Sequence, residues 1–446
     1  MMKMSEPEQA VYVFVPGKNW QLSLAELGSY FTTRECRFRV TNLSKSFFVL
    51  ESDRHLDPVI ADELGGTLKI SAVLSQIPIG MVKDAFLHKN RQAQSDVRSR
   101  LPSGDSVGEI FNLRQGKCVF GVSLYFDDSQ FFRLSGEIHR FVGSHFKQEL
   151  AAQGVRAKFM GFPRNRKFPQ LTNVEIIKKR LVGESAEILL CIGREQAFIA
   201  KTVAVHNPFE FQKRDVERPV QRKIFSIPPR LAKMMVNLSS CLSGRLLLDP
   251  FCGVGTILQE ALLAKAHVTG MDIDPWCVEA SRANLEWLKN EYRLKDASYR
   301  VLQGNARSLT TQIQEETVDC IATEPDLGPA LRHFPTERYA RGIVDKLKPM
   351  YIDFLAEAFR VLRREGRIVI VVPYIKTRTG STVTLNIEEK ALAIGFESVC
   401  PIRAEDFLEC GPLIEKLVAA SSFVDMEKRH KIGRRICVLQ KGRSKN

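Results

Sequence analysis

The C-terminal half of the chain alternates short apolar segments with amphipathic ones, and this alternation constrains the fold more than any other feature. Apolar runs that predict strands fall at residues 246–248, 267–271, 320–323 and 367–372. Helical spacing is found between them, at residues 256–264, 278–289 and 345–364. The pattern predicts a Rossmann-like α/β fold, in which helices cover both faces of a mostly parallel sheet. Two further strands are predicted near the end, at residues 397–401 and 435–440.

Two smaller α+β units are predicted before this domain. In the first unit, strands are expected at residues 11–15, 37–40 and 47–50, and Ser23 is expected to begin a helix. In the second unit, a helix is expected at residues 139–153, with strands at residues 118–126, 155–159, 186–191 and 197–205. The polar residues 88–116 between the units have little periodicity, so we predict a connecting segment there.

The charge of the chain indicates an anionic partner. The 446 residues include 65 Lys and Arg against 51 Asp and Glu, a net charge of +14. Nucleic acid and a membrane surface are the two candidates. Residues 141–225 hold sixteen Lys or Arg but only eight Asp or Glu. This local surplus of positive charge is more than half of the surplus of the whole chain. We therefore expect this region to bind the anion, with a basic helical face at Lys178, Lys179 and Arg180.

The sequence predicts a cytoplasmic protein without membrane contact. No segment approaches the roughly 20 apolar residues of a membrane-spanning helix, and the N-terminal sequence lacks the apolar core of a signal peptide. The ten cysteines are scattered, without a C-x-x-C pair or a Cys/His cluster. Most of them are therefore predicted to be reduced and buried, and no metal site is expected.

The loop at residues 249–256, with the sequence DPFCGVGT, lies between a predicted strand and a predicted helix. Ligands of open α/β sheets bind at this edge. Gly253 and Gly255 let a ligand approach the backbone, and Thr256 is expected to cap the helix. A dinucleotide loop would have a third glycine. The acid Asp249 instead suits a ligand with a cationic group, such as the ammonium of S-adenosylmethionine.

The next two predicted strands end in polar residues as well. Asp272 and Asp274 follow one strand, where an acid can accept hydrogen bonds from both hydroxyls of a ribose. Asp272 is favoured because it comes first, and at least one of the pair is expected to cap the following helix. Asn305 follows the other strand, and its side chain could bind the edge of an adenine, although Gly-Asn is also a common turn.

A further turn, with the sequence Thr-Glu-Pro-Asp-Leu-Gly at residues 323–328, follows a fourth strand. Glu324 and Asp326 flank Pro325 there, and both carboxylates could accept hydrogen bonds from an amino group that is being methylated. A rigid turn with two solvated acids is an equally good interpretation of the same residues. We take Glu324, Pro325 and Asp326 as the candidate catalytic residues.

In this order, the four segments resemble class I S-adenosylmethionine-dependent methyltransferases. The resemblance is closest to THUMP-domain tRNA guanosine-N2-methyltransferases of the guanosine-10 type. The DPFCGVGT loop, the DIDP sequence at residues 272–275 and a linker with the sequences KRDVERP and IPPRLAKMMVNL carry it. The resemblance implies an N-terminal ferredoxin-like domain (1–90), a THUMP-like RNA-binding domain (91–208), a linker (209–235) and a methyltransferase domain (236–446).

The resemblance also implies residue roles. S-adenosylmethionine would contact Asp249, Phe251, Gly253, Gly255, Thr256, Asp272, Ile273, Asn305 and Ala306. The tRNA would contact the basic residues, including Arg214 and Arg218 of the linker. The implied product is N2-methylguanosine in tRNA, at position 10 or nearby. No metal is implied, and the chain would act as a monomer or with a small activating subunit.

The reactive turn departs from the family pattern, which is Asp or Asn, two prolines and an aromatic residue. Here Asp326 replaces the second proline and Leu327 the aromatic residue that stacks on the target base. Phe334 or Tyr339 could supply the missing ring. Two alternatives therefore stay open: a non-catalytic RNA-binding protein that retains the cofactor site, and an amino-methyltransferase acting on ribosomal RNA or DNA.

Overall fold

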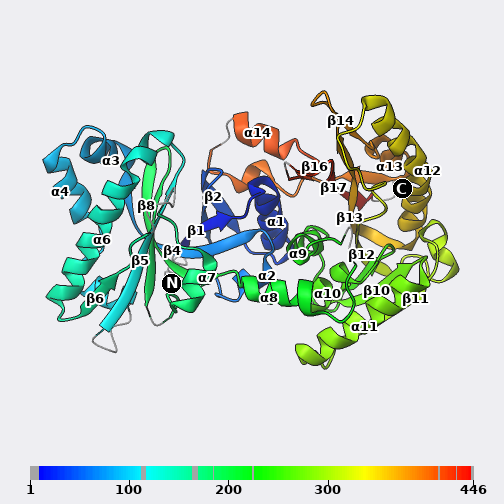
Figure 1. The fold of residues 1–446 in the computed structure, drawn as a ribbon, viewed down its shortest axis with the longest axis horizontal. Coiled ribbons are helices and arrows are strands. Elements are labelled where there is room, and N and C mark those ends of the chain that lie inside the picture. Colours follow the sequence, from blue (N-terminus) through cyan, green and yellow to red (C-terminus); the bar gives the residue numbers. More distant parts are fainter. Residues whose placement is uncertain are drawn as a thin grey trace, which may run out of the picture.

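The computed structural model describes residues 10–111, 117–162, 169–183, 185–222, 226–409, 412–427 and 429–442. The molecule is elongated, with one β-sheet in each half (Figure 1). In the described part of the chain, no helix is both long and apolar enough to cross a bilayer. Nine of the ten cysteines are described; all nine are free and eight are buried, as predicted.

The first sheet has eight strands in the order β2-β3-β1-β4-β8-β7-β5-β6. Their bounds are β1 Ala10–Pro16, β2 Phe38–Leu43, β3 Phe48–Ser52, β4 Thr67–Pro78, β5 Lys117–Phe126, β6 Arg156–Phe159, β7 Ala186–Ile192 and β8 Gln196–Val205. Strand β4 pairs with β1 on one side and with β8 on the other, in both cases antiparallel. The two predicted N-terminal units therefore share one continuous sheet.

Helices α1 (Trp20–Thr33) and α6 (Ser135–Ala152) are the longest in this half. The prediction that Ser23 begins a helix is wrong by one turn, because the Asn19 side chain caps α1 by accepting a hydrogen bond from the Leu22 N–H. Other short helices are α2 Ile60–Glu63, α3 Ile79–Phe86, α7 Asn173–Lys178, α8 Pro208–Gln212 and the 3-10 helix η1 Ser129–Leu134.

The predicted connecting segment at residues 88–116 is wrong where the structure describes it. Helices α4 (Arg91–Ser99) and α5 (Asp105–Phe111) form there. Val97 and Phe111 are buried in the apolar core of this half. Each helix is so short that it contributes only two or three buried residues, and its other residues are polar or glycine. The apolar period was therefore too brief to be visible.

The second sheet has the strand order β11-β10-β9-β12-β13-β17-β15, with β14 beside β13 and β16 beside β17. The strands are β9 Leu246–Asp249, β10 His267–Asp272, β11 Tyr299–Gln303, β12 Val318–Thr323, β13 Leu362–Lys376, β14 Thr382–Thr384, β15 Phe396–Ser398, β16 Ser422–Asp425 and β17 Ile432–Lys441. Strands β9 to β13 are parallel, and β17 is antiparallel to β13. The strand order reverses between β9 and β12, which is the switch point where such sheets bind ligands.

Helices cover both faces of this sheet, as predicted. One apolar cluster joins the sheet to α9 (Pro229–Leu238), α10 (Thr256–Leu263) and α11 (Pro275–Glu291). The other joins it to α12 (Glu337–Val361), α13 (Glu388–Ile394) and the 3-10 helix η3 Ala306–Thr311. Val369 and Val371 face the first cluster while Ile368 and Ile370 face the second, as the pleat of a strand requires. The last short elements are η4 Ala404–Asp406, α14 Pro412–Val418 and the π-helix η2 Lys213–Glu217.

A buried polar contact between α1 and α9 joins the two halves. Glu26 is fully buried, and its carboxylate accepts hydrogen bonds of 2.7 Å from the backbone N–H groups of Gly65 and Gly66 and from the Asn237 amide. Burial raises the pKa of Glu26, and these donors oppose that effect. Arg230 of α9 also donates to the Gly65 carbonyl, at 2.8 Å. The PPRLAKMMVNL part of the linker is thus a structural joint.

We expect Asn237→Ala to destabilise the protein by about 1–3 kcal/mol, because the substitution leaves a buried carboxylate with one donor fewer. Urea unfolding at fixed pH measures the change. Asn290→Ala on the exposed face of α11 removes an amide of the same size and is the matched control. Equal midpoints for the two variants would contradict the structural role of this contact.

Candidate active site

The site lies at the carboxyl ends of β9, β10 and β12, at the switch point of the sheet. The DPFCGVGT loop turns sharply there, with φ of +53° at Gly253 and +84° at Gly255. A side chain at Gly255 would meet Ser281, whereas a Cβ at Gly253 would point into open space. The backbone at Gly253 can therefore be approached closely by a ligand.

The expectation that Thr256 caps α10 is wrong. Gly255 occupies the cap position, and Thr256 is the first residue of the helix. The Thr256 hydroxyl instead accepts a hydrogen bond of 2.6 Å from the buried Arg218 guanidinium. This hydrogen bond connects the linker to the N-terminus of helix α10.

Asp249 is almost completely buried at the end of β9. One carboxylate oxygen accepts hydrogen bonds from the Thr323 hydroxyl, at 2.7 Å, and from the Phe251 N–H, at 3.2 Å. Burial raises the pKa of Asp249 from its ordinary 3.8 to about 7, and the negative charges of Asp272 and Glu324 add to the effect. A cationic group bound beside it would stabilise the carboxylate.

Asp272 and Asp274 have different contacts. The Asp272 carboxylate accepts hydrogen bonds from the Gly253 N–H, at 2.9 Å, and from the Asp274 N–H, at 3.0 Å, so it links β10 to the loop. Asp274 accepts from the Trp276 N–H and caps α11, as expected for one of the two acids. Ile273 lies between them and is 68% exposed, which leaves an apolar surface free beside Asp272.

Asn305 follows β11 and is exposed, and Ala306 beside it is buried. The Asn305 side-chain oxygen accepts a hydrogen bond of 3.0 Å from the Arg307 N–H and so caps η3. This places Asn305 at the same edge of the sheet as Asp249 and Asp272, since β11 is parallel to β10. In the structure Asn305 therefore has a local role as the cap of η3.

The reactive turn follows β12. Both carboxylate oxygens of Glu324 are bound by the Arg434 guanidinium of β17, with the second contact at 3.1 Å. Pro325 is buried, and Asp326 is exposed. The Asp326 carboxylate accepts a hydrogen bond of 2.9 Å from the Gly328 N–H, so Asp326 shapes the turn. The two acids thus differ: Glu324 is held by a cation, and Asp326 faces solvent.

Two cavities have residues of this turn in their walls. The smaller one has a volume of about 70 Å³ and lies over the loop, with Asp249, Gly253 and Glu324 in its wall. The larger one has a volume of about 810 Å³ and lies between Asp326 and the first turns of α12. The reactive turn therefore contributes one acid to each cavity.

The structure contradicts the prediction that Arg214 and Arg218 contact RNA. Both side chains are at most 4% exposed. Arg214 donates to the buried Glu260 at 2.6 Å, and Arg218 bonds Thr256 and Ser226. These linker arginines hold α10 and the linker together. No RNA could reach them without unfolding this region.

The basic helical face at residues 173–181 is only partly correct. Helix α7 ends at Lys178, Lys179 follows as its cap residue, and Arg180 has a left-handed backbone, with φ of +48°. All three side chains are exposed, but only Lys178 lies in the helix, and Lys179 and Arg180 follow it in a turn.

Two residues of the site were missed in the sequence. Arg434 is 110 residues from Glu324, in a strand whose pairing with β13 brings it to the turn. The sequence predicts Thr323 only as part of the turn, yet its hydroxyl donates a hydrogen bond to Asp249. No local pattern marks either contact. Among the described residues, no group of three or more His, Cys, Asp or Glu could hold a metal ion.

Comparison with known proteins shows similarity to methyltransferases. A family described as RMKL-like, methyltransferase domain, matches residues 218–392, and one described as DNA methylase matches residues 80–283. A tRNA (guanine(10)-N2)-dimethyltransferase from Methanothermobacter thermautotrophicus is 37% identical over 160 residues, which are 35% of this chain and 42% of the relative. The protein of the same name from Pyrococcus abyssi is 35% identical over 164 residues, with coverages of 37% and 44%. The chain thus matches less than half the length of each relative.

Two solved structures share the fold over nearly the whole chain. TrmN from Thermus thermophilus has a TM-score of 0.51 at 17% identity, covering 97% of this chain and 100% of that one. A possible methylase from Clostridium difficile 630 has a TM-score of 0.50 at 13% identity, with coverages of 98% and 99%. The chain has the α/β class I methyltransferase fold, and part of it is similar to tRNA (guanine(10)-N2)-dimethyltransferases.

Proposed function

We propose that the protein methylates the exocyclic amino group of a guanosine in tRNA, with S-adenosylmethionine as the methyl donor. The observation that carries the proposal is the acidic switch point, where Asp249, Asp272 and Glu324 end three neighbouring strands beside an open glycine loop. Position 10, which the relatives' names give, is the proposed target, and the product is N2-methylguanosine.

The residues present fit S-adenosylmethionine. A buried carboxylate whose pKa is raised to about 7 suits the cofactor's ammonium, and the open space at Gly253 suits its close approach. Asp272 would receive the ribose hydroxyls, with Ile273 against the adenine and Asn305 at its edge. When bound, the cofactor supplies an electrophilic methyl group on a sulfonium.

The chain's own residues would orient the guanine amino group. Its nitrogen is a weak nucleophile because the lone pair is delocalised into the ring. We assign Glu324 as the acceptor of one amino hydrogen, because Arg434 fixes its carboxylate beside the loop. A backbone carbonyl of the turn would accept the other hydrogen, which turns the lone pair toward the methyl group. Most of the rate gain would come from this orientation.

We assign tRNA binding to the N-terminal half, with a ferredoxin-like domain at 1–90 and a THUMP-like domain at 91–208. The sequence surplus of basic residues in 141–225 supports this assignment. The shape of the RNA, rather than base reading along a helix, would give specificity. We propose that the chain acts either as a monomer or together with a small activating subunit.

Neutralising Lys178, Lys179 and Arg180 to Gln should weaken tRNA binding and flatten the slope of log affinity against log salt by about two, because each phosphate contact contributes roughly 0.7–0.9. Filter binding at several salt concentrations measures both quantities. The matched control replaces three exposed lysines of the other half, Lys295, Lys390 and Lys416. An equal loss of tRNA affinity in the control would show that the total charge of the protein, and not the position of these three residues, determines binding.

Transfer of labelled methyl groups from S-adenosylmethionine tests the function and its rivals together. The purified protein is offered unmodified tRNA, ribosomal RNA and duplex DNA in parallel. We expect incorporation into tRNA. Incorporation only into ribosomal RNA or DNA would favour an amino-methyltransferase that acts on those nucleic acids. Cofactor binding without any methyl transfer would favour a non-catalytic RNA-binding protein.

A further inference from the structure

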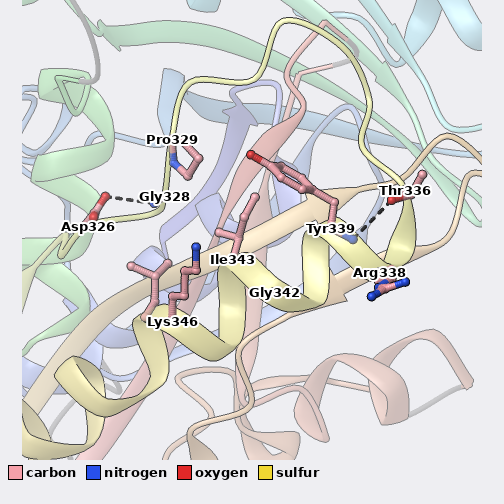
Figure 2. Close-up of a pocket in the computed structure, with 10 residues that line it drawn as sticks. Asp326, Gly328, Pro329, Thr336, Arg338, Tyr339, Gly342, Ile343 and Lys346 are labelled. Carbon is pink, nitrogen blue, oxygen red and sulfur yellow. Dashed lines mark hydrogen bonds between the residues drawn. The ribbon is translucent and has the colours of Figure 1, made fainter.

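The side chains that line the larger cavity have no role in the methyl transfer proposed above. One wall is the turn from Asp326 to Pro329, and the other is a single face of α12 that carries Tyr339, Ile343 and Lys346 (Figure 2). Helix α12 begins at Glu337, two turns before the predicted start at 345, because the Thr336 hydroxyl accepts the Tyr339 N–H. This extra length is what builds the second wall.

Tyr339 crosses this cavity. Its ring reaches from α12 toward Pro329 on the opposite wall (Figure 2). The side chain is 56% exposed, and neither the ring nor the hydroxyl has a partner among the described residues. A large aromatic side chain without partners, facing a cavity, is a platform on which a flat ligand can stack.

The floor of the cavity is apolar and open. Ile343 is buried there, and a Cβ added at Gly342 would meet nothing within 4 Å. A glycine inside a helix costs stability relative to alanine, so Gly342 provides space at that cost. Lys346 and Arg338 lie at the rim, and neither has an ion-pair partner in the described part of the chain. The cavity thus combines an aromatic face, an apolar floor and unpaired cations.

Leu327 cannot serve as this platform. Its side chain is partly buried and packs against the apolar cluster of α9 and α10, and it is absent from the cavity wall. An aromatic residue at position 327 would therefore enter the protein interior rather than the cavity. The position that carries the stacking residue in the resembling family is therefore packed against the core in this chain.

We propose that this cavity receives the target base of the RNA, and that Tyr339 stacks on it from α12. The inference rests on the proposed function, because the base must lie beside the reactive turn. Asp326 lines the same cavity, so the base would lie next to that turn. Lys346 and Arg338 would contact the phosphates that flank the extruded nucleotide. Extrusion exposes both faces of a base, and stacking on one of them offsets part of its cost.

Steady-state methyl transfer to tRNA with Tyr339→Ala, Tyr339→Phe and Gly342→Leu tests the inference. Tyr339→Ala should lower kcat/KM for tRNA about tenfold or more, mainly through KM. Tyr339→Phe should recover most of that loss, because a stacked ring needs no hydroxyl. Gly342→Leu should act like Tyr339→Ala by filling the floor. Calorimetry should show unchanged S-adenosylmethionine affinity in all three variants.

Arg341→Ala is the matched control, since Arg341 lies on the same stretch of α12 but pairs with Glu337 outside the cavity. An active wild type whose kcat/KM is unaffected by Tyr339→Ala and Gly342→Leu would overturn the stacking role and leave the proposed function intact. A fall in Tyr339→Phe as large as in Tyr339→Ala would also overturn it. A wild type that transfers no methyl group to any RNA would instead overturn the proposed function, and the base-binding role with it.

Discussion

Asp249→Asn should stabilise the protein without cofactor at pH 8 and, at the same pH, abolish most of its affinity for S-adenosylmethionine. The buried carboxylate has a pKa of about 7 in the folded protein instead of 3.8. Its ionisation therefore costs folding free energy on the order of 4 kcal/mol. The Asn side chain keeps an oxygen for the Thr323 and Phe251 donors but carries no charge.

The direction of the pH dependence follows from the raised pKa. Below pH 4, Asp249 is protonated in both folded and unfolded protein, and the two variants should be about equally stable. Between pH 4 and 7 only the folded state of the wild type binds this proton, so wild-type stability falls relative to Asp249→Asn as the pH rises. Above pH 7 the difference is constant and has its full size.

Cofactor affinity should change in the opposite direction, because the ammonium needs the carboxylate. The loss of a charge-assisted bond should weaken binding by more than tenfold above pH 7. Wild-type affinity should itself weaken as the pH falls below 7. Urea unfolding and calorimetry at pH 5 and 8 measure both effects, with Asp296→Asn on an exposed loop as control. Equal stability of Asp249→Asn and wild type at pH 8 would contradict this account of the site.

Glu324→Gln should lower kcat by about 100-fold, which corresponds to roughly 3 kcal/mol of transition-state stabilisation. The amide is a weaker acceptor for an amino hydrogen, and it no longer holds Arg434 by charge. Cofactor affinity should change little, because Asp249 and Asp272 remain. Single-turnover methyl transfer with saturating cofactor isolates the chemical step.

Glu388→Gln is the matched control for this variant. Glu388 pairs with Arg435, the neighbour of Arg434 in β17. Glu388→Gln therefore breaks a similar ion pair that lies away from the turn. We expect Glu388→Gln to retain the wild-type rate even if it loses as much stability as Glu324→Gln. A normal rate in Glu324→Gln would exclude this carboxylate from the chemistry.

The C-terminal half was largely predictable from its sequence, because four of its five parallel strands contain compact apolar runs and the glycine loop marks the functional edge. The cofactor candidates Asp249 and Asp272 accordingly lie together as predicted. The N-terminal half was less predictable, since the pairing of β4 with β8 joins residues more than 100 positions apart and has no local signature.

The roles of basic residues were the least predictable feature. The resemblance implied that Arg214 and Arg218 contact RNA, and charged residues are usually exposed. Their acidic or hydroxyl partners, Glu260 and Thr256, lie in a later helix and become visible only in the folded chain. The contact of Arg434 with Glu324 was hidden for the same reason.

Nucleoside mass spectrometry of tRNA treated with the protein and labelled S-adenosylmethionine tests the central claim most directly. The account predicts labelled N2-methylguanosine from the wild type and about 100-fold slower formation of the same nucleoside with Glu324→Gln. A label on a ring nitrogen, on a ribose or on another base would contradict it. So would wild-type and Glu324→Gln proteins that form N2-methylguanosine at the same rate.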